Sequence, residues 1–260
     1  MGFLKGKKIL ITGISNKKSI AFGIAKAMYK QKAELNFVCQ NKKIINKVNY
    51  LIRPMSANSI FFCDVSNDEN IKEFFFDLKK TWKKFDGFVH SIAYCPKKQI
   101  NEDFIKNSTK ESFILSHEIS SYTFLSMARE SINMLNKFSS LVTLSYIGAQ
   151  KVLSNYNVIG SAKASLEANV RYMAYSLGKK NIRVNAISSG PIKTISSRQI
   201  KKFYKVQEYQ KSVSLIKNYI TSKEIGNVAA FLCSDLSLGI TGSIIYVDNG
   251  FHINIPNEII

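Results

Sequence analysis

The chain has 260 residues, of which 45% are hydrophobic and 21% are charged. This composition excludes a low-complexity disordered chain, because such chains lack the apolar residues needed to offset conformational entropy. The longest stretch without a charged residue, 138–150, has 13 residues. A membrane-spanning helix needs about 20 apolar residues, so we expect no membrane span.

Apolar runs alternate with segments of helical period along the whole chain. In chain order, the pattern predicts strands at residues 8–12, 34–39, 59–63, 86–92, 140–145, 183–187 and 243–247. Between them it predicts helices at 19–31, 43–53, 67–82, 110–135, 157–177 and 221–233, with an irregular stretch at 94–107. Continuous Val, Ile and Leu runs are typical of parallel strands that are buried on both faces. We therefore expect an α/β fold: one Rossmann-like, doubly wound domain over residues 1–260, with a seven-stranded parallel sheet and helices on both faces.

The chain is strongly basic, with 37 Lys and Arg against 18 Asp and Glu. Only five of the basic residues are Arg, and the Lys residues are scattered in twos and threes. Because bidentate readers of bases and phosphates favour Arg, this pattern argues against a nucleic-acid partner. The cysteines Cys39, Cys63, Cys95 and Cys233 lack C-x-x-C and metal-ligand spacing, and no secretory segment precedes the first strand. We expect reduced thiols, no metal site and a cytoplasmic protein.

The turn after the first predicted strand has features of a phosphate-binding loop. It contains Gly13 and runs through Ser19 into the start of a helix. A helix N-terminus directs backbone N–H groups and a positive dipole end toward a pyrophosphate. The plain G-x-G-x-x-G fingerprint is missing, so a tight turn that merely requires glycine is the alternative.

The ends of the second and third strands carry polar residues that suit the adenosine half of a dinucleotide. Gln40 stands where NAD enzymes usually carry an acid for the ribose hydroxyl. Its amide can bond the ribose hydroxyls, whereas Lys42 and Lys43 can receive the 2′-phosphate of NADPH. Asp64, after the third strand, suits either an adenine amino group or a helix cap. The cofactor preference stays open at this point.

Tyr156 and Lys163 have the most informative spacing in the chain. Seven residues are close to two helical turns, so the two side chains share one face about 10 Å apart along a helix. A ligand between them can touch both, and a Lys ammonium favours a phenol that donates to a developing oxyanion. A Tyr and a Lys at this spacing are also common on helix surfaces. Small residues at 160–162 and 164–165 favour close approach of a ligand.

The segment after the sixth strand begins with Gly190 and Pro191, which force a turn against which a planar ring can lie. The residues that follow, 195–212, are polar and weakly patterned. We expect them to form a mobile segment over a binding site of acyl size, and they are termed the flap below.

These motifs together resemble one family. The resemblance rests on the Gly13-x5-Ser19 turn, on residues 90–93 (His-Ser-Ile-Ala), on Tyr146, Tyr156 and Lys163, on the runs 164–173 and 183–187, and on Gly190-Pro191. Over essentially its whole length the chain resembles the bacterial NADH-dependent enoyl-acyl-carrier-protein reductases, a divergent branch of the short-chain dehydrogenase/reductases. Tyr-x6-Lys replaces the Tyr-x3-Lys of ordinary members of that superfamily. A 3-ketoacyl reductase, the main alternative, would carry Tyr at position 159, where this chain has Ile159.

The resemblance implies an activity, an assembly and residue roles. The activity is NADH-dependent reduction of the trans-2 double bond of enoyl chains on acyl carrier protein, the last step of type II fatty acid elongation, by a homotetramer. Tyr156 would stabilise the enolate, Lys163 would hold the nicotinamide ribose, and Tyr146 would be a second active-site phenol. The implied cofactor-binding residues are Gly13, Ser19, Ile20, Gln40, Asp64, Val65, Ile92, Lys163, Ile192, Lys193, Thr194, Ile195 and Ser196. Cys95 matches a substrate-binding position.

Other residues near the implied site differ from the family pattern or suggest contacts. Ala93, Tyr94 and Cys95 stand where the family pattern has a glycine, an aromatic residue and a small alanine-like residue, and the added bulk affects substrate and inhibitor fit. The acidic surface of acyl carrier protein is expected to meet lysines near the flap, namely Lys201, Lys202 or Lys205. The histidines His90, His117 and His252 are expected to be structural.

Overall fold

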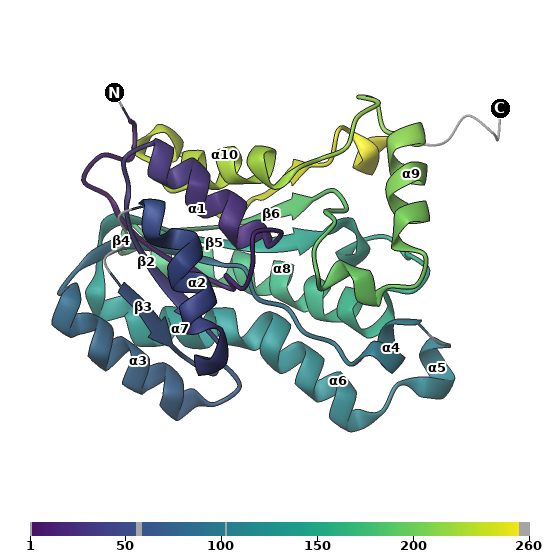
Figure 1. The fold of residues 1–260 in the computed structure, drawn as a ribbon, viewed down its shortest axis with the longest axis horizontal. Helices are drawn as coiled ribbons and strands as arrows, with labels where there is room; N and C mark the ends of the chain where they lie inside the picture. The colour runs from purple at the N-terminus through teal and green to yellow at the C-terminus, as the bar shows by residue number, and fades with distance from the viewer. Residues whose placement is uncertain (1, 56–58, 102, 255–260) are drawn as a thin grey trace.

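The computed structural model describes residues 2–55, 59–101 and 103–254, and strands and helices alternate along them (Figure 1). The strands are β1 (Lys8–Thr12), β2 (Glu34–Cys39), β3 (Ser59–Phe62), β4 (Phe85–His90), β5 (Leu135–Tyr146), β6 (Arg183–Ser189) and β7 (Ile244–Val247). All neighbouring pairs are parallel, in the order β3-β2-β1-β4-β5-β6-β7. The chain runs outward in one direction from β1 and in the other from β4, so the topological switch point lies between these two strands. The predicted fold class is confirmed.

Helices cover both faces of this sheet. They are α1 (Ile20–Lys30), α2 (Ile45–Ile52), α3 (Asp68–Thr81), α4 (Lys97–Asn101), α5 (Phe104–Asn107), α6 (Lys110–His117), α7 (Thr123–Ser131), α8 (Asn157–Gly178), α9 (Phe203–Val213) and α10 (Ser222–Leu232). In Figure 1, α1 and α10 lie above the sheet, and α3, α7 and α8 lie below it. In the described ranges, no helix combines the length and the apolar character needed to cross a membrane.

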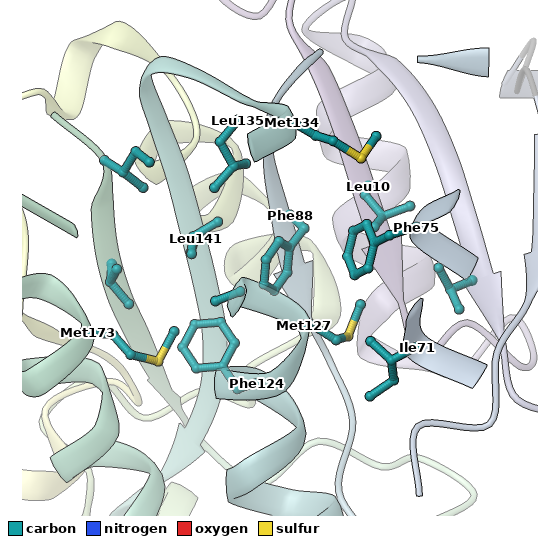
Figure 2. Packing of buried hydrophobic residues seen from close by; sticks show 14 of the residues in the cluster. Leu10, Ile71, Phe75, Phe88, Phe124, Met127, Met134, Leu135, Leu141 and Met173 are labelled. Atoms are coloured by element: carbon teal, nitrogen blue, oxygen red, sulfur yellow. The ribbon is translucent and has the colours of Figure 1, made fainter. Parts of the chain in front are cut away.

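Each face of the sheet has its own hydrophobic core. On the face of α3, α7 and α8, Phe88 and Leu141 of neighbouring strands pack among Phe75, Phe124 and Met127 (Figure 2). The opposite core joins the other faces of the strands to α1, α2 and α10. Because the two cores pack against the strands from both sides, the carboxyl ends of the strands are held in place, and so are the starts of the loops that follow them.

The predicted helix over 110–135 is wrong in its continuity and its end. The structure divides it into α6, a π-helical turn over Glu118–Tyr122 and α7, and β5 begins at Leu135. Hydroxyl side chains account for the interruption: the Thr123 hydroxyl donates to the Ile119 carbonyl at 2.7 Å, and the Ser120 hydroxyl donates to the Tyr94 carbonyl at 3.0 Å. Such bonds from side chain to backbone compete with the helical ladder and bend it.

Two segments that were expected to be irregular contain helices. Residues 94–107 form α4 and α5, and the flap contains α9. α9 has few apolar residues to mark its buried side, and its one fully buried member is a glutamine, Gln210. Phe203, Val206 and Val213 recur at helical spacing, but the largely polar composition of the segment led to the expectation of an irregular stretch.

Candidate active site

The turn after β1 passes directly over the end of β4. Gly13 has φ +80°, and a Cβ at this position would lie 1.9 Å from the carbonyl oxygen of Ser91. Both the left-handed backbone and the close approach require glycine. The Thr12 hydroxyl donates to the Val89 carbonyl at 3.2 Å and accepts from the Ser91 N–H at 3.2 Å. The floor of the switch point is thus rigidly defined by the ends of these two strands.

The same turn leads into the N-terminus of α1. Ser19 is the N-cap, and its hydroxyl accepts from the Phe22 N–H at 3.3 Å and donates to the Asn16 carbonyl at 2.8 Å. Ile20 is the first residue of the helix. A capped helix of 11 residues without acidic groups in its first turn suits an anionic phosphate.

The adenosine side of the edge lies after β2 and β3. Gln40 follows β2 directly and is exposed, and Val65 is buried beyond β3. The Asp64 carboxylate accepts from the N–H and the hydroxyl of Ser66, at 3.1 and 2.8 Å. Asn67, and not Asp64, caps α3, so the helix-cap alternative for Asp64 is wrong. The side chain of Lys42 lies outside the described part of the chain.

A cavity of about 410 Å³ opens beside the turn after β1. Its lining residues come from that turn, from α2 and from the start of the flap: Asn16, Lys17, Lys18, Lys47, Tyr50, Leu51, Ile195 and Arg198. Four of these residues are basic, which suits the phosphates of a dinucleotide.

Two tyrosines meet at the carboxyl end of β5, and a lysine of α8 bonds the same strand. Tyr146 ends this strand, Tyr156 is the N-cap residue of α8, and Lys163 lies on the buried side of α8. The two phenol rings meet edge to face, with centroids 5.0 Å apart. The Tyr156 ring rests on Gly148, where an added Cβ would lie 2.4 Å from the ring carbon Cδ1. Tyr146 and Tyr156 therefore lie in contact, and the predicted pairing of Tyr156 with Lys163 stays a prediction.

Burial sets the protonation of these groups. It lowers the pKa of Lys163 to about 8, and the negative charge of Glu167 opposes this effect. Lys163 is 5% exposed, and its ammonium group donates to the Leu144 carbonyl at 2.8 Å. Burial raises the pKa of both the Tyr146 and the Tyr156 phenol far above the usual range. At neutral pH the phenols keep their protons and can donate hydrogen bonds.

The substrate side of the site is apolar. Cys95 is 5% exposed and belongs to a cluster with Ile100, Val158, Ile159 and Ala162, against which Tyr156 and Ile200 pack. Burial raises the pKa of the Cys95 thiol, which therefore behaves as a small apolar group. Ile200 comes from the flap, so the flap contributes to the same apolar wall as Tyr156.

The turn after β6 links the edge of the sheet to the flap. Ile192 is buried, whereas Lys193, Ile195 and Ser196 are exposed. Thr194 donates its N–H to the Ser197 hydroxyl at 2.8 Å and accepts from the Ser197 N–H at 3.0 Å. The backbone at Thr194 is thereby held at the edge where the site is expected.

The flap helix is fixed by two glutamine side chains. Gln207 donates to the Pro191 carbonyl at 3.0 Å, and Gln210 donates to the Asp248 carbonyl at 3.2 Å. Sequence reasoning missed both residues, together with buried Glu167. The only available signal for Glu167 was its place four residues after Lys163, on the same side of a helix.

The histidines play no part in this arrangement. His90 is fully buried between Thr123 and Thr143, and burial followed by the charge of Lys163 lowers its pKa to about 3. His252 contacts Asp248 at 3.0 Å. Among the described residues, no group of three His, Cys, Asp or Glu side chains gathers as metal ligands.

Three comparisons place the chain among known proteins. A family model described as Enoyl-(Acyl carrier protein) reductase matches residues 13–252. A protein of Buchnera aphidicola subsp. Schizaphis graminum, Enoyl-[acyl-carrier-protein] reductase [NADH] FabI, is 74% identical over 260 residues, with both chains fully covered.

Solved structures show the same similarity. The Anaplasma phagocytophilum enoyl-(acyl-carrier-protein) reductase in complex with NAD has a TM-score of 0.93 at 37% identity, covering 96% of this chain and 95% of that chain. The Bacillus cereus Enoyl-Acyl Carrier Protein Reductase with NADP+ and indole naphthyridinone has a TM-score of 0.95 at 35% identity, covering 97% and 99% of the two chains.

Proposed function

The chain belongs to the enoyl-acyl-carrier-protein reductase family and is an NADH-dependent oxidoreductase, and we propose that Tyr156, Lys163 and Tyr146 are its catalytic residues. The reaction is reduction of the trans-2 double bond of an enoyl chain on acyl carrier protein, the last step of type II fatty acid elongation. The observation that supports these roles is the contact of two protonated phenols at the carboxyl end of β5, where buried Lys163 bonds the Leu144 carbonyl of the same strand.

Each catalytic residue has a defined task. When bound, NADH would supply the hydride for the β-carbon of the substrate, and protonation of the α-carbon would follow. The Tyr156 hydroxyl donates a hydrogen bond to the thioester oxygen and stabilises the negative charge that develops there, because its raised pKa keeps the proton on the phenol. The Lys163 ammonium binds the nicotinamide ribose hydroxyls and adds positive charge. Tyr146 packs edge-on against Tyr156 and forms the side of the site next to its ring.

The order of the strands supports the proposed cofactor site. A dinucleotide across the switch point would have its adenosine over β2 and β3 and its nicotinamide over β5 and β6. Gly13, Ser19 and Ile20 would bind the pyrophosphate, Gln40, Asp64 and Val65 the adenosine, and Ile92 the middle of the cofactor. Residues 192–196 (Ile, Lys, Thr, Ile and Ser) would hold the carboxamide and phosphates, and Cys95 would contact the substrate.

We also propose the partner, the assembly and the location. Acyl carrier protein is acidic, and its surface would meet exposed Lys201, Lys202 and Lys205 at the start of α9. The flap would open to admit the acyl chain and close over it. The chain would work as a homotetramer in the cytoplasm, within the one domain of residues 1–260.

The test of the catalytic roles is oxidation of NADH or NADPH, followed at the reduced-nicotinamide band with a crotonyl thioester. We expect rapid NADH oxidation that Tyr156→Phe reduces at least about 100-fold, since one oxyanion donor is lost. Tyr175→Phe, an equivalent change on the exposed side of α8, is the control and should match the unmodified protein. Equal activity of Tyr156→Phe and the control would refute the role of Tyr156.

The partner site needs a separate comparison of substrates. Reversing Lys201, Lys202 and Lys205 to Glu should raise the KM for a carrier-bound enoyl substrate and leave the KM for a coenzyme A analogue unchanged. Lys79→Glu on α3 is the matched control, because it reverses an exposed charge on the other side of the molecule. Equal changes for both substrates would contradict docking at the flap.

A further inference from the structure

Glu167 is a buried acid that the catalytic roles above leave without a task. It is 4% exposed and lies one helical turn after Lys163 on α8. A carboxylate at such depth is costly unless it is bonded and compensated. Its oxygen Oε1 accepts from the Ser145 hydroxyl at 2.6 Å, and Oε2 accepts from the Gln150 amide at 3.0 Å.

Glu167 and Lys163 bind consecutive residues of the same strand. Lys163 donates to the carbonyl of Leu144, and Glu167 accepts from the side chain of Ser145. The next residue along β5 is Tyr146. The amide oxygen of Gln150 in turn accepts from the Tyr246 hydroxyl at 2.7 Å, which connects the carboxylate to β7. Two opposite charges of α8 thus hold the strand end that carries the active-site phenol.

We propose that Glu167 is a positioning residue for the reaction: its buried carboxylate keeps the Lys163 ammonium charged and fixes the Ser145 end of β5 beneath the substrate. The inference rests on the proposed function, because it gives Glu167 a role only through Lys163 and Tyr146. The ammonium bonds a carbonyl, so the carboxylate acts on it through space.

The groups around Lys163 leave Glu167 as its compensating charge. From β4, His90 is neutral, because burial and the Lys163 charge hold its pKa near 3. Tyr156 at the start of α8 and Tyr146 on β5 have raised pKa values and are neutral as well. Asp248, after β7, acts on Tyr146. Burial lowers the pKa of Lys163, and Glu167 is the group that opposes this effect.

The test is the pH dependence of kcat/KM in Glu167→Gln. Gln has nearly the same shape and keeps an acceptor for Ser145, but it removes the charge. We expect the alkaline limb of the profile, where Lys163 loses its proton, to move to lower pH by about one unit. Glu73→Gln removes the same charge from the exposed side of α3 and should leave the limb in place. A loss of packing alone would lower activity at every pH without moving the limb.

The same Glu167→Gln change, made in the Lys163→Met variant, tests the role of Glu167 separately from the proposed catalytic role of Lys163. In Lys163→Met, adding Glu167→Gln should produce no further shift, since the titrating group is gone. Unchanged activity of Lys163→Met would refute the proposed role of Lys163 itself. An unshifted limb in folded Glu167→Gln, with Lys163→Met crippled, would overturn the inference about Glu167 alone.

If Glu167→Gln does not fold, a measurement on the unmodified protein can test the role of Glu167 instead. The carboxyl carbon of Glu167 can be followed by NMR over the active pH range, with Glu167→Asp for its assignment. An ionised carboxylate throughout this range supports the proposal. A carboxyl that is protonated near neutral pH overturns it, because a neutral acid cannot compensate Lys163.

Discussion

The two walls of the proposed site are built in different ways. The wall formed by β5 and α8 consists of buried charges and rings: Lys163 and Glu167 are both at most 5% exposed. The flap consists of exposed polar residues around a helix that two glutamines attach to neighbouring carbonyls. The first wall therefore suits the chemistry, which needs fixed dipoles and charges in a dry environment.

The difference has an energetic meaning. Atoms of the β5 and α8 wall can move only if buried charges lose their partners, which is costly. The flap can move at the cost of a small number of hydrogen bonds, among them those of Gln207, Glu208 and Gln210, each worth about 1 kcal/mol, and a few apolar contacts. Changes in the first wall should therefore act on the rate, and changes in the second on substrate access.

The largest effect is expected at the turn after β1, which passes over the end of β4 at the floor of the site. Gly13→Ala places a Cβ 1.9 Å from the Ser91 carbonyl oxygen in a backbone with φ +80°. We expect a loss of about 3 kcal/mol or more in the free energy of unfolding, together with loss of NADH binding, because the turn must move off β4. Urea unfolding and NADH fluorescence measure these two quantities.

A matched glycine provides the control for this change. At Gly239 an added Cβ meets nothing within 4 Å, and φ is not positive. Gly239→Ala should therefore change stability by less than about 1 kcal/mol. Similar losses in the two variants would show that the turn after β1 is not specially constrained.

Lys163→Met is the next change in size, and it affects both activity and stability. We expect kcat/KM to fall about 100-fold, because the ribose contact and the positive charge are both lost. Stability should also fall, because Lys163→Met leaves the buried Glu167 carboxylate without its compensating charge. A large stability loss with unchanged kcat/KM would reverse the assignment and make Lys163 structural.

The same lysine predicts opposite pH trends for stability and activity. Its pKa is about 8 in the folded protein, against 10.5 for an unperturbed lysine side chain. Between these two values the unfolded chain binds more protons, so the contribution of Lys163 to stability rises with pH, by about 1.4 kcal/mol per unit at most. Below pH 8 its unfavourable contribution is fully present. Activity should fall over the same pH range above 8 in which the contribution of Lys163 to stability rises.

Comparing the unmodified protein with Lys163→Met isolates this effect. The free energy of unfolding of the unmodified protein, minus that of Lys163→Met, should rise as the pH rises above 8. Urea unfolding at several pH values gives the difference. A constant difference would mean that Lys163 does not titrate in this window.

The sequence predicted the sheet, because its buried strands follow from patterns that are local along the chain, whereas the pairing of Tyr156 with Lys163 stays a prediction. Strand bounds such as 8–12 and 34–39 agree with the structure, since a buried strand is a continuous apolar run. The break after α6 was not predictable, because it depends on a contact between Ser120 and distant Tyr94. Glu167 was missed for the same reason: its partners on β5 and beyond become neighbours only in the fold.

The smallest predicted effect lies in the flap and tests the second wall. Gln210→Leu removes one of the two bonds to the Asp248 carbonyl, which keeps the bond from the Phe251 N–H, and the loss costs about 1 kcal/mol locally. We expect faster amide hydrogen exchange over α9 and a KM for carrier-bound substrate raised a few-fold, with kcat nearly unchanged. Tyr204→Phe, on the exposed side of α9, is the control. A fall in kcat with normal exchange would mean that the flap takes part in the chemistry, and the division between the two walls would then fail.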